Sequence, residues 1–485
     1  RTGSGMTDYN DSIAYQRMEE LTNVHLDWTH PTSGQETIQF NLMIASQEYQ
    51  DMLMASESYF IGGFDKFIDD DIIIDLAPYT EYMKNYMQKR SITEDALRDS
   101  VTDKGRLAAW HTVNYTWQPP FAGLIMRDDW ASELGIEPSE VITYDDLYDA
   151  LTAFKNAGFD TYEFSYSNVG CTDGSDNYLL NGRNCYDTFY NIDGTMYYGP
   201  YTEEFYDHLL MFRKWYQEGL IDPDFYSRSR SDNESLILNG KVPVPYTDYI
   251  NLERFDINTV GTEDAEWTPI GYPLETEDTV RRIMIMSSMK WIKGSGIEIS
   301  SACDESLIPI ICQWVDYLFT EEGRILANYG IEGESFYYDE DGNPQFLDIV
   351  TKNPEGLGQN IMQSKMTFSS NGLGGSWYTW SREITPTMSE KERVTCGEVW
   401  AANSDPCPQP SLQIAEENYT EYSSIYNDIQ TYVDEWVVKA VTGLIDLEAE
   451  YPNFYFTSKC CIYSTDRYTD TNIITISNKI RMTIY

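Results

Sequence analysis

The sequence is poor in basic residues. Lys and Arg number 33 against 79 Asp and Glu, which gives a formal net charge of −46 at pH 7. A surface this acidic repels phosphate backbones, so we expect no nucleic-acid partner. It also argues against docking on anionic lipid through a basic patch. The acidity keeps a secreted protein soluble and identifies no ligand by itself.

Long apolar runs, metal-ligand patterns and catalytic motifs are also missing from the sequence. No segment approaches the roughly 20 apolar residues of a membrane span. There is no CxxC pair among the eight cysteines and there are only four histidines, so we expect no zinc site. GxSxG, HExxH, phosphate-loop and dinucleotide motifs do not occur. We therefore predict a protein that is not an enzyme and that uses no cofactor and no metal.

Two features remain open to more than one interpretation. Cys171 and Cys185 bracket one polar loop and Cys396 and Cys407 another; each pair either closes as a disulfide, adding ~2–4 kcal/mol, or consists of free thiols. The acidic segment 339–343 (DEDGN) is typical of a hairpin turn. A calcium loop is disfavoured there because no downstream ligand series of the EF-hand kind follows.

The order of apolar and polar segments favours an α/β architecture. At 485 residues the chain exceeds one compact core, and strand-like runs alternate with helical ones. The clearest example begins with the apolar run Ala122 to Met126, which predicts a strand buried on both faces. A short helix ending at Gly135 follows, and Thr143 with Asp146 forms a predicted capping box for the next helix.

Aromatic residues are abundant, at 14% of the chain with 38 Tyr and 12 Trp. A sugar ring has apolar C–H faces and hydroxyl edges, so its binding sites pair stacking aromatics with planar polar groups. Core packing is the commoner role of any single aromatic, but three clusters in loop contexts carry polar groups alongside. They comprise Trp110, His111, Tyr115, Trp117 and Gln118; Tyr246, Asp248 and Tyr249; and Trp377, Tyr378 and Trp380. For His111 the sequence offers no partner for proton transfer.

Several phrases, in order along the chain, resemble family 1 extracellular solute-binding proteins, the lipoprotein components of carbohydrate importers. They are NDSIAYQRMEELTNVHLDW, LMIASQEYQDML, KGRLAAWHTVNYTWQPPFAGLIMRDDWASELGI, WYQEGLIDPDF followed by LILNGKV, VDYLFTEEGRILANYGIEGESFYYDEDGNPQF and IYNDIQTYVDEWVVKAVTGLIDLE. This ordered set spans most of residues 8–448 and is far more specific than any one phrase. The loop between Cys171 and Cys185 departs from the family pattern as an insertion. After Glu450 the polar, Thr-rich tail no longer resembles the family's final helix; it is either a shifted reading frame or a divergent tail, and we expect it to pack poorly.

The resemblance implies a two-lobe, type II periplasmic-binding-protein-like α/β fold, with hinge crossings and a ligand cleft between the lobes. Lobe one would hold residues 1–122 and 283–335, and lobe two 123–282 and 336–485, of which 451–485 form the atypical tail. Binding loops of both lobes would contribute the three aromatic clusters. By loop context they would also contribute Asp8, Asn10, Ser56, Tyr59, Tyr166 and Asn168.

The resemblance further implies a bacterial extracellular receptor that captures an oligosaccharide and passes it to the permease of an ABC-type importer. We expect a monomer, lipid-anchored to the outer face of the cytoplasmic membrane by an anchor outside this chain. The first residues, RTGSGMTDYN, contain no export signal, and we interpret them as a trimmed start. The alternatives are a peptide receptor of the same fold, a surface adhesin, and a carbohydrate-active enzyme such as a glycosidase or lyase.

Overall fold

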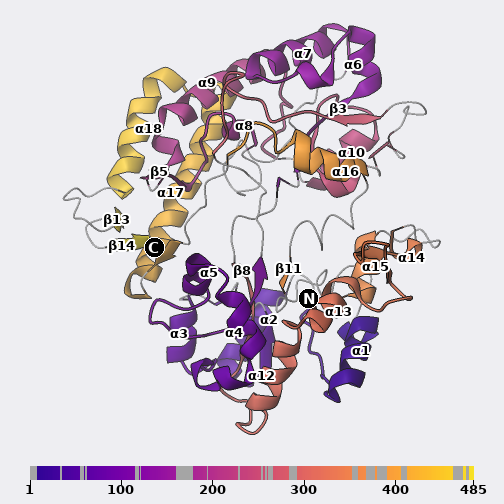
Figure 1. Ribbon diagram of the computed structural model, residues 1–485. Helices are drawn as coiled ribbons and strands as arrows, with labels where there is room; N and C mark the ends of the chain where they lie inside the picture. Colours follow the sequence, from indigo (N-terminus) through magenta and orange to yellow (C-terminus); the bar gives the residue numbers. More distant parts are fainter. Residues whose placement is uncertain are drawn as a thin grey trace. The chain divides into compact units, whose positions relative to one another are not determined.

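The computed structural model divides into two compact units, each assembled from separate parts of the chain (Figure 1). Unit 1 comprises Arg1–Trp117, Lys290–Ser389 and Ala415–Thr420, and unit 2 comprises Gln118–Met289, Glu390–Ile414 and Glu421–Tyr485. The structure describes residues 8–32, 35–54, 59–60, 63–114, 119–120, 122–159, 178–193, 195–227, 230–252, 255–256, 259, 266–282, 292–351, 359–367, 377–378, 390–405, 412–414, 416–462, 473–476 and 480–484.

Unit 1 is built on a four-stranded sheet with the order β1-β8-β2-β11, in which only the β2·β11 pair is parallel. Its strands are β1 (Met52–Met54), β2 (Trp110–Asn114), β8 (Ile292–Ile299), β9 (Phe336–Tyr338), β10 (Pro344–Phe346) and β11 (Trp377–Tyr378). Its helices are α1 (Ile13–Thr22), α2 (Glu36–Ser46), α3 (Gly63–Asp69), α4 (Lys84–Arg90), α5 (Glu94–Asp99), α12 (Ile308–Tyr317), α13 (Glu321–Tyr329), α14 (Asp348–Thr351) and α15 (Gln359–Met366).

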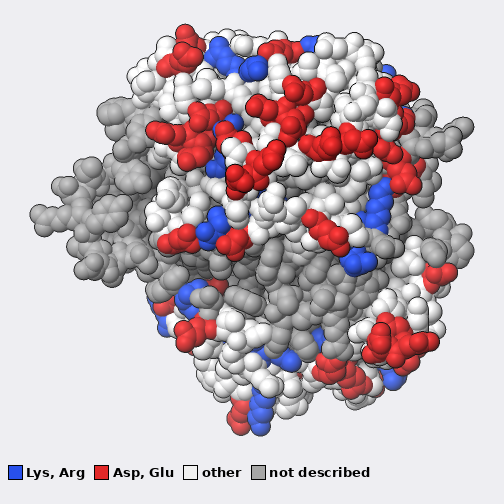
Figure 2. Space-filling view, turned by 45° about the horizontal axis from the view of Figure 1, so that its top comes forward, with Lys and Arg blue, Asp and Glu red and all other residues white. Residues whose placement is uncertain are grey.

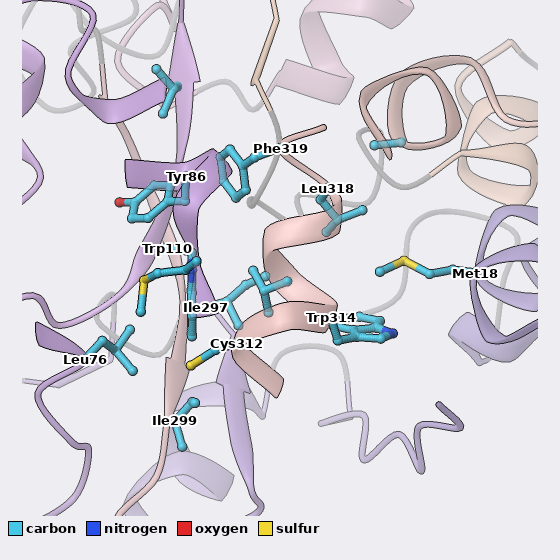
Figure 3. Close-up of a cluster of buried hydrophobic side chains, with 14 of the residues drawn as sticks. Met18, Leu76, Tyr86, Trp110, Ile297, Ile299, Cys312, Trp314, Leu318 and Phe319 are labelled. Carbon is cyan, nitrogen blue, oxygen red and sulfur yellow. The ribbon is translucent and has the colours of Figure 1, made fainter. Parts of the chain in front are cut away.

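The main core of unit 1 lies between this sheet and α12. Ile308, Cys312 and Val315 recur at helical spacing along α12 and are all buried, which makes one face of that helix apolar. Figure 3 shows this face with Trp110 of β2 and Ile297 of β8, which are direct partners in the antiparallel register. Burial of such side chains contributes about 25 cal/mol per Å² of apolar surface and is the main stabilising term.

One buried carboxylate joins two parts of unit 1 that are far apart in sequence. Asp316, near the end of α12, accepts hydrogen bonds from the backbone N–H groups of Asn85 (3.2 Å) and Tyr86 (2.7 Å). These N–H groups belong to the first turn of α4, where backbone N–H groups have no acceptor within the helix. The negative charge also lies at the positive end of the helix dipole. Asp316 therefore supplies the N-terminal cap that α4 lacks locally.

Residues 336–367 belong to unit 1, whereas we had predicted lobe two for everything after residue 335. The physical reason is a satellite core in which Phe336, Phe346, Val350 and Met362 pack around Tyr329 of α13. The first passage out of unit 1 follows Trp117 and the return precedes Lys290, so the boundaries also differ from the predicted 122 and 283. These long-range contacts cannot be predicted from the sequence, because each partner has the local pattern of an ordinary buried residue.

The acidic segment after β9 is the hairpin turn that the sequence predicted. Strands β9 and β10 pair in antiparallel register, with Tyr338 opposite Pro344. Asp339 organises the turn, because its carboxylate accepts from the backbone N–H groups of Asp341 (3.0 Å) and Asn343 (2.7 Å). These bonds lower the pKa of Asp339. The carboxylate is thus satisfied by the turn itself.

Unit 2 contains a three-stranded antiparallel sheet with the order β6-β3-β7. Its strands are β3 (Ala122–Arg127), β4 (Phe189–Ile192), β5 (Thr195–Tyr198), β6 (Tyr246–Asp248), β7 (Trp267–Pro269), β12 (Leu412–Ile414), β13 (Ile473–Ile476) and β14 (Ile480–Ile484). Its helices are α6 (Asp128–Leu134), α7 (Tyr144–Asn156), α8 (Tyr178–Asn181), α9 (Glu203–Gln217), α10 (Arg230–Leu238), α16 (Glu390–Val394) and α18 (Leu447–Ile462), with α17 (Glu416–Thr442) joining unit 2 from Glu421 onward.

The predicted strand–helix–helix segment of unit 2 is confirmed. All six residues of β3 are buried, and α6 ends at Gly135, whose φ of 70° is left-handed. At the start of α7, Thr143 accepts from the N–H of Asp146 (3.2 Å), and the Asp146 carboxylate accepts from the N–H of Thr143 (2.7 Å). This is the capping box that the sequence predicts.

The C-terminal tail is more ordered than we expected from the sequence. Helix α18 continues to Ile462, and Phe454 in it is fully buried and stacked on Trp436 at a centroid distance of 4.0 Å. Beyond it, β13 and β14 pair with each other, and β14 pairs with β12. The prediction of poor packing is therefore wrong for this part of α18, because its aromatic residues meet those of α17.

Candidate functional site

Described residues from two of the three predicted aromatic clusters lie on neighbouring strands of unit 1: Trp110 and His111 on β2, and Trp377 and Tyr378 on β11. Strand β11 runs parallel to β2, with Trp377 opposite Val113 and Tyr378 opposite Asn114. More than 260 residues separate the two strands in sequence. The sequence predicted each cluster separately, and the sheet brings their backbones together.

Trp110 belongs to the core of unit 1 rather than to a surface that a ligand reaches. Its side chain is fully buried among the apolar residues around Ile297 (Figure 3). His111 points to the other face of the strand but is buried as well, with its ring at 70° to that of Phe64. We had predicted both as ligand contacts. Core packing describes the two side chains better than ligand contact, because β2 is a central strand covered on both faces.

A second group of candidate residues in unit 1 surrounds the short 3₁₀ helix Tyr9–Asp11. Asp8 caps this helix, since its Oδ1 accepts from the N–H of Asn10 at 2.8 Å. The Asn10 side-chain amide in turn donates to the carbonyl of Leu26 at 3.3 Å. The Asp8 side chain keeps 43% of its exposure, so its carboxylate is open to solvent and to a ligand.

Trp28 and His30 join this group, and the sequence interpretation missed them as site residues. The Trp28 ring lies 5.0 Å from that of Tyr9, edge-on, and 6.1 Å from that of His30, nearly parallel. His30 Nε2 lies 3.8 Å from Asp8 Oδ1. The available signal was the alternation of apolar and polar residues from Val24 to Trp28, which predicts an extended segment with Val24, Leu26 and Trp28 on one face. In the structure these three pack against the core that contains Tyr9.

Tyr59 is the remaining predicted residue of unit 1 whose side chain the structure describes. It is 37% exposed, and its ring lies 6.0 Å from that of Phe40 on α2. Its exposed area is suited to stacking, but no described contact links it with Asp8 or with β11.

The third predicted cluster lies at the edge of the unit 2 sheet. Tyr246 and Asp248 are the first and last residues of β6, and Tyr249 begins the 3₁₀ helix that follows. All three side chains are half-buried. Asp248 pairs in register with Ala122, the first residue of β3. Two aromatic rings and a carboxylate are thus presented within four consecutive residues.

Tyr272 and Trp400 hydrogen-bond to the backbone of β3 and so help to fix the position of β6, which pairs with it. The Tyr272 hydroxyl donates to the carbonyl of Ala122. The Trp400 indole N–H donates to the carbonyl of Leu124 at 3.1 Å. The indole ring also lies against Gly123, where an added Cβ would be 2.5 Å from the ring. Only glycine permits this approach.

Arg281 completes this support as a buried cation. Its guanidinium lies 4.3 Å from the centre of the Tyr272 ring and donates to the carbonyl oxygens of Trp400 and Ala402, the latter at 2.9 Å. Burial lowers the pKa of Arg281 to about 10, an effect that the nearby Tyr272 opposes. The cation–π contact partly replaces the water that the guanidinium has lost.

Two of the cysteines discussed above are buried free thiols. Cys185 and Cys396 are both fully buried, and burial raises the pKa of each thiol well above its ordinary value. Asp248 and Glu392 raise the pKa of Cys396 further, which places Cys396 close to the β6 cluster. Their possible partners, Cys171 and Cys407, lie outside the described residues.

The described residues contain neither a metal-ligand cluster nor a membrane-spanning helix. Within the ranges given above, no three His, Cys, Asp or Glu side chains come together in a way that could hold a metal ion. Among the described helices, none is long and apolar enough to cross a membrane.

The chain resembles known proteins in part of its sequence and in its fold. No protein-family model matches it. Lipoprotein LipO of Bacillus subtilis (strain 168) is 24% identical over 347 residues, and the match covers 67% of this chain and 64% of LipO. The chain therefore spans less than two thirds of the length of this curated relative.

The structural matches extend over almost the whole chain. An extracellular solute-binding protein from Bifidobacterium longum subsp. infantis superposes with a TM-score of 0.75 at 14% identity, covering 95% of this chain and 93% of that one. The chain has the fold of extracellular solute-binding proteins. The Streptococcus pneumoniae ABC-transporter substrate-binding protein FusA, in complex with kestose, matches with a TM-score of 0.71 at 15% identity over 94% of each chain. The predicted type II two-lobe α/β fold class is thereby confirmed.

On this solute-binding-protein fold, the structure describes the side chains of only some of the predicted site residues. Of Trp377 and Tyr378 it describes the backbone alone. Several predicted site residues lie outside the described residues altogether: Ser56, Tyr115, Trp117, Gln118, Tyr166, Asn168 and Trp380.

Proposed function

We propose that this protein is an extracellular receptor that captures an oligosaccharide and delivers it to the permease of an ABC-type importer. The observation that carries the proposal is the match of 94% of the chain to the fold of FusA, a substrate-binding protein solved with the oligosaccharide kestose. The carbohydrate chemistry is supported by the residues of the chain itself, which place aromatic and carboxylate side chains together in each unit.

In unit 2, Tyr246 and Tyr249 would pack against the C–H faces of sugar rings, and Asp248 between them would accept from hydroxyl groups. In unit 1, Trp377 and Tyr378 would supply the aromatic surface and Asp8 and Asn10 the polar groups. Charged acceptors form the stronger hydrogen bonds with hydroxyls, so the two aspartates would set orientation. No covalent step is required of any residue.

Units 1 and 2 would act as the two lobes, closing around the ligand about the segments that connect them. Ligand would favour the closed state only through contacts that exist in that state, and this preference would couple capture to closure. The permease would recognise the closed form. We further propose that the receptor is a monomer held at the outer face of the cytoplasmic membrane by a lipid anchor, as the name of the relative LipO suggests.

The proposal is tested by thermal unfolding of the purified chain with a panel of kestose, chitotriose, maltotriose, xylotriose and a mannuronate trisaccharide, with trialanine and pentaalanine as peptide probes. A probe at 100 times its dissociation constant stabilises the folded state by about 2.7 kcal/mol. We expect at least one saccharide, and neither peptide, to raise the melting temperature. A response to peptides alone would overturn the sugar assignment, and new reducing ends after incubation would overturn the receptor assignment.

Single substitutions locate the site. Trp377→Ala and Asp248→Asn should each weaken binding of the saccharide that stabilises the wild type most, measured by titration calorimetry. Tyr337→Ala is the matched control, because Tyr337 is 47% exposed on the β9 strand and lies outside the proposed site. Unchanged affinity in both site variants would remove these residues from the site while leaving the receptor assignment standing.

A further inference from the structure

His30 lies in a setting that fixes its ring but leaves one nitrogen available. The ring is nearly parallel to that of Trp28, at an interplanar angle of 14°, and meets the Tyr9 ring edge-on at 4.7 Å. Its side chain keeps 15% of its exposure. Two aromatic neighbours thus hold the imidazole in one orientation at the surface of unit 1.

The backbone determines which nitrogen of His30 carries the proton. The N–H of Tyr9 donates to His30 Nε2 at 3.3 Å. An amide N–H can only donate, so Nε2 must be an unprotonated acceptor, and the neutral ring then carries its proton on Nδ1. Within the described part of the chain Nδ1 has no partner. The ring therefore presents a donor with a fixed position and a known tautomer.

Asp8 presents an acceptor beside this donor. Its Oδ1 is occupied by the N–H of Asn10, and Oδ2 has no partner among the residues that the structure describes. A sugar hydroxyl both donates and accepts, and neighbouring hydroxyls on one ring lie close enough to meet two adjacent protein groups. We propose that His30 and Asp8 form a subsite for neighbouring sugar hydroxyls, with His30 Nδ1 donating to one and Asp8 Oδ2 accepting from the other. This subsite rests on the proposed function and adds His30, which no sequence pattern had marked as a site residue.

The subsite makes sugar binding depend on pH. Protonation would turn Nε2 into a donor that opposes the Tyr9 N–H and is drawn to Asp8, which disrupts the loop and the hydroxyl contacts together. Burial lowers the pKa of His30, Asp8 raises it, and the amino terminus of the chain lowers it. The remaining titratable groups packed on the ring are Tyr9, whose pKa burial raises to about 12, and Tyr15 beyond it; neither ionises near neutrality. Affinity should therefore fall below pH 6.5.

Two substitutions separate a ligand contact from a purely structural role. In His30→Asn the side-chain amide can replace the Nδ1 donor, whereas in His30→Gln the amide oxygen can replace Nε2 as acceptor for Tyr9 but no group replaces Nδ1. The probe is the panel saccharide that stabilises the wild type most, and its dissociation constant is measured by calorimetry from pH 5 to 8. His25→Gln serves as the control, because His25 is exposed and paired with Glu19 at 2.7 Å.

We expect His30→Gln to lose about five- to tenfold in affinity at pH 7.5, the worth of one hydrogen bond, and His30→Asn to keep most of it. In both His30 variants the affinity should no longer decline at acid pH, whereas the affinity of His25→Gln should still decline. If Gln preserves affinity and Asn loses it, or if both variants bind and titrate like the wild type, the subsite is overturned while the receptor assignment stands. If no saccharide binds the wild type, the proposed function fails and the subsite with it.

Discussion

At the scale of single residues, the protein carries an imidazole that its fold keeps uncharged. His208 lies on the buried face of α9, stacked on Phe212 at 5.5 Å. Burial, together with the nearby positive charge of Arg183, lowers the pKa of His208 to about 3. In the unfolded chain a histidine has a pKa near 6.5. At a pH between these two pKa values, His208 therefore binds a proton in the unfolded chain and not in the folded protein.

This residue predicts acid sensitivity. Because the folded-state pKa is depressed, stability is complete above about pH 6.5 and falls as the pH drops toward 3, by up to ~1.4 kcal/mol per pH unit from this group. His208→Leu should remove that part of the slope when the free energy of unfolding is measured by urea titration between pH 4.5 and 7.5. His25→Gln should retain it, and an unchanged slope in His208→Leu would refute the assignment.

At the scale of elements, β3 and the groups behind it determine where the β6 cluster lies. The strand is buried on both faces, it pairs with β6 and β7, and its carbonyls at Ala122 and Leu124 are bound by Tyr272 and Trp400. The contact of Trp400 with Gly123 allows no added carbon atom. A shift of β3 at Gly123 would also displace the paired strand β6, which carries Asp248.

Gly123→Ala should therefore affect both stability and binding. The new methyl group must displace the Trp400 ring, and overpacking of this kind typically costs about 1–3 kcal/mol. We expect a lower free energy of unfolding in urea and a weaker affinity for the best saccharide of the panel. Gly271→Ala is the control, because its nearest atom, the carbonyl oxygen of Val399, is 4.0 Å away. Equal stability in the two variants would contradict the packing argument.

The elements also show what the sequence can and cannot predict. Strand β3, helix α7 and the turn at Asp339 follow from local patterns, since an apolar run, a capping box and an acidic turn act within a few residues. The pairing of β2 with β11 and the packing around Tyr329 depend on partners distant in sequence. Trp110 was misjudged for the same reason: an aromatic residue beside polar neighbours looks alike in a binding loop and in a central strand. For His30 the decisive fact was a backbone contact that no side-chain pattern encodes.

At the scale of the whole molecule, the dominant property is its negative charge. Asp and Glu cover far more of the face seen in Figure 2 than Lys and Arg do. Like charges at this density repel one another, and the compact state suffers more than the unfolded chain because it holds them closer together. Neutral sugars gain little from this field, so charge and recognition should respond separately to salt.

We expect the melting temperature to rise by several degrees between 10 mM and 500 mM NaCl, since the Debye length falls from about 30 Å to a few ångströms. The dissociation constant for a neutral saccharide should change by less than about twofold over the same range. A melting temperature that fell with salt would mean that ion pairs, such as those of Arg106 with Asp65 and Asp69, outweigh the repulsion.

The cap that Asp316 places on α4 also has a consequence for biosynthesis. Helix α4 emerges from the ribosome more than 220 residues before the carboxylate that completes it, and β8, the strand that separates β1 from β2, also follows α4 by about 200 residues. A nascent chain that ends before Ile292 lacks Ile297, the register partner of Trp110, and Asp316, which accepts from the N–H of Tyr86. Unit 1 therefore cannot complete its core until the chain has returned to it, and its folding depends on contacts between residues far apart in sequence.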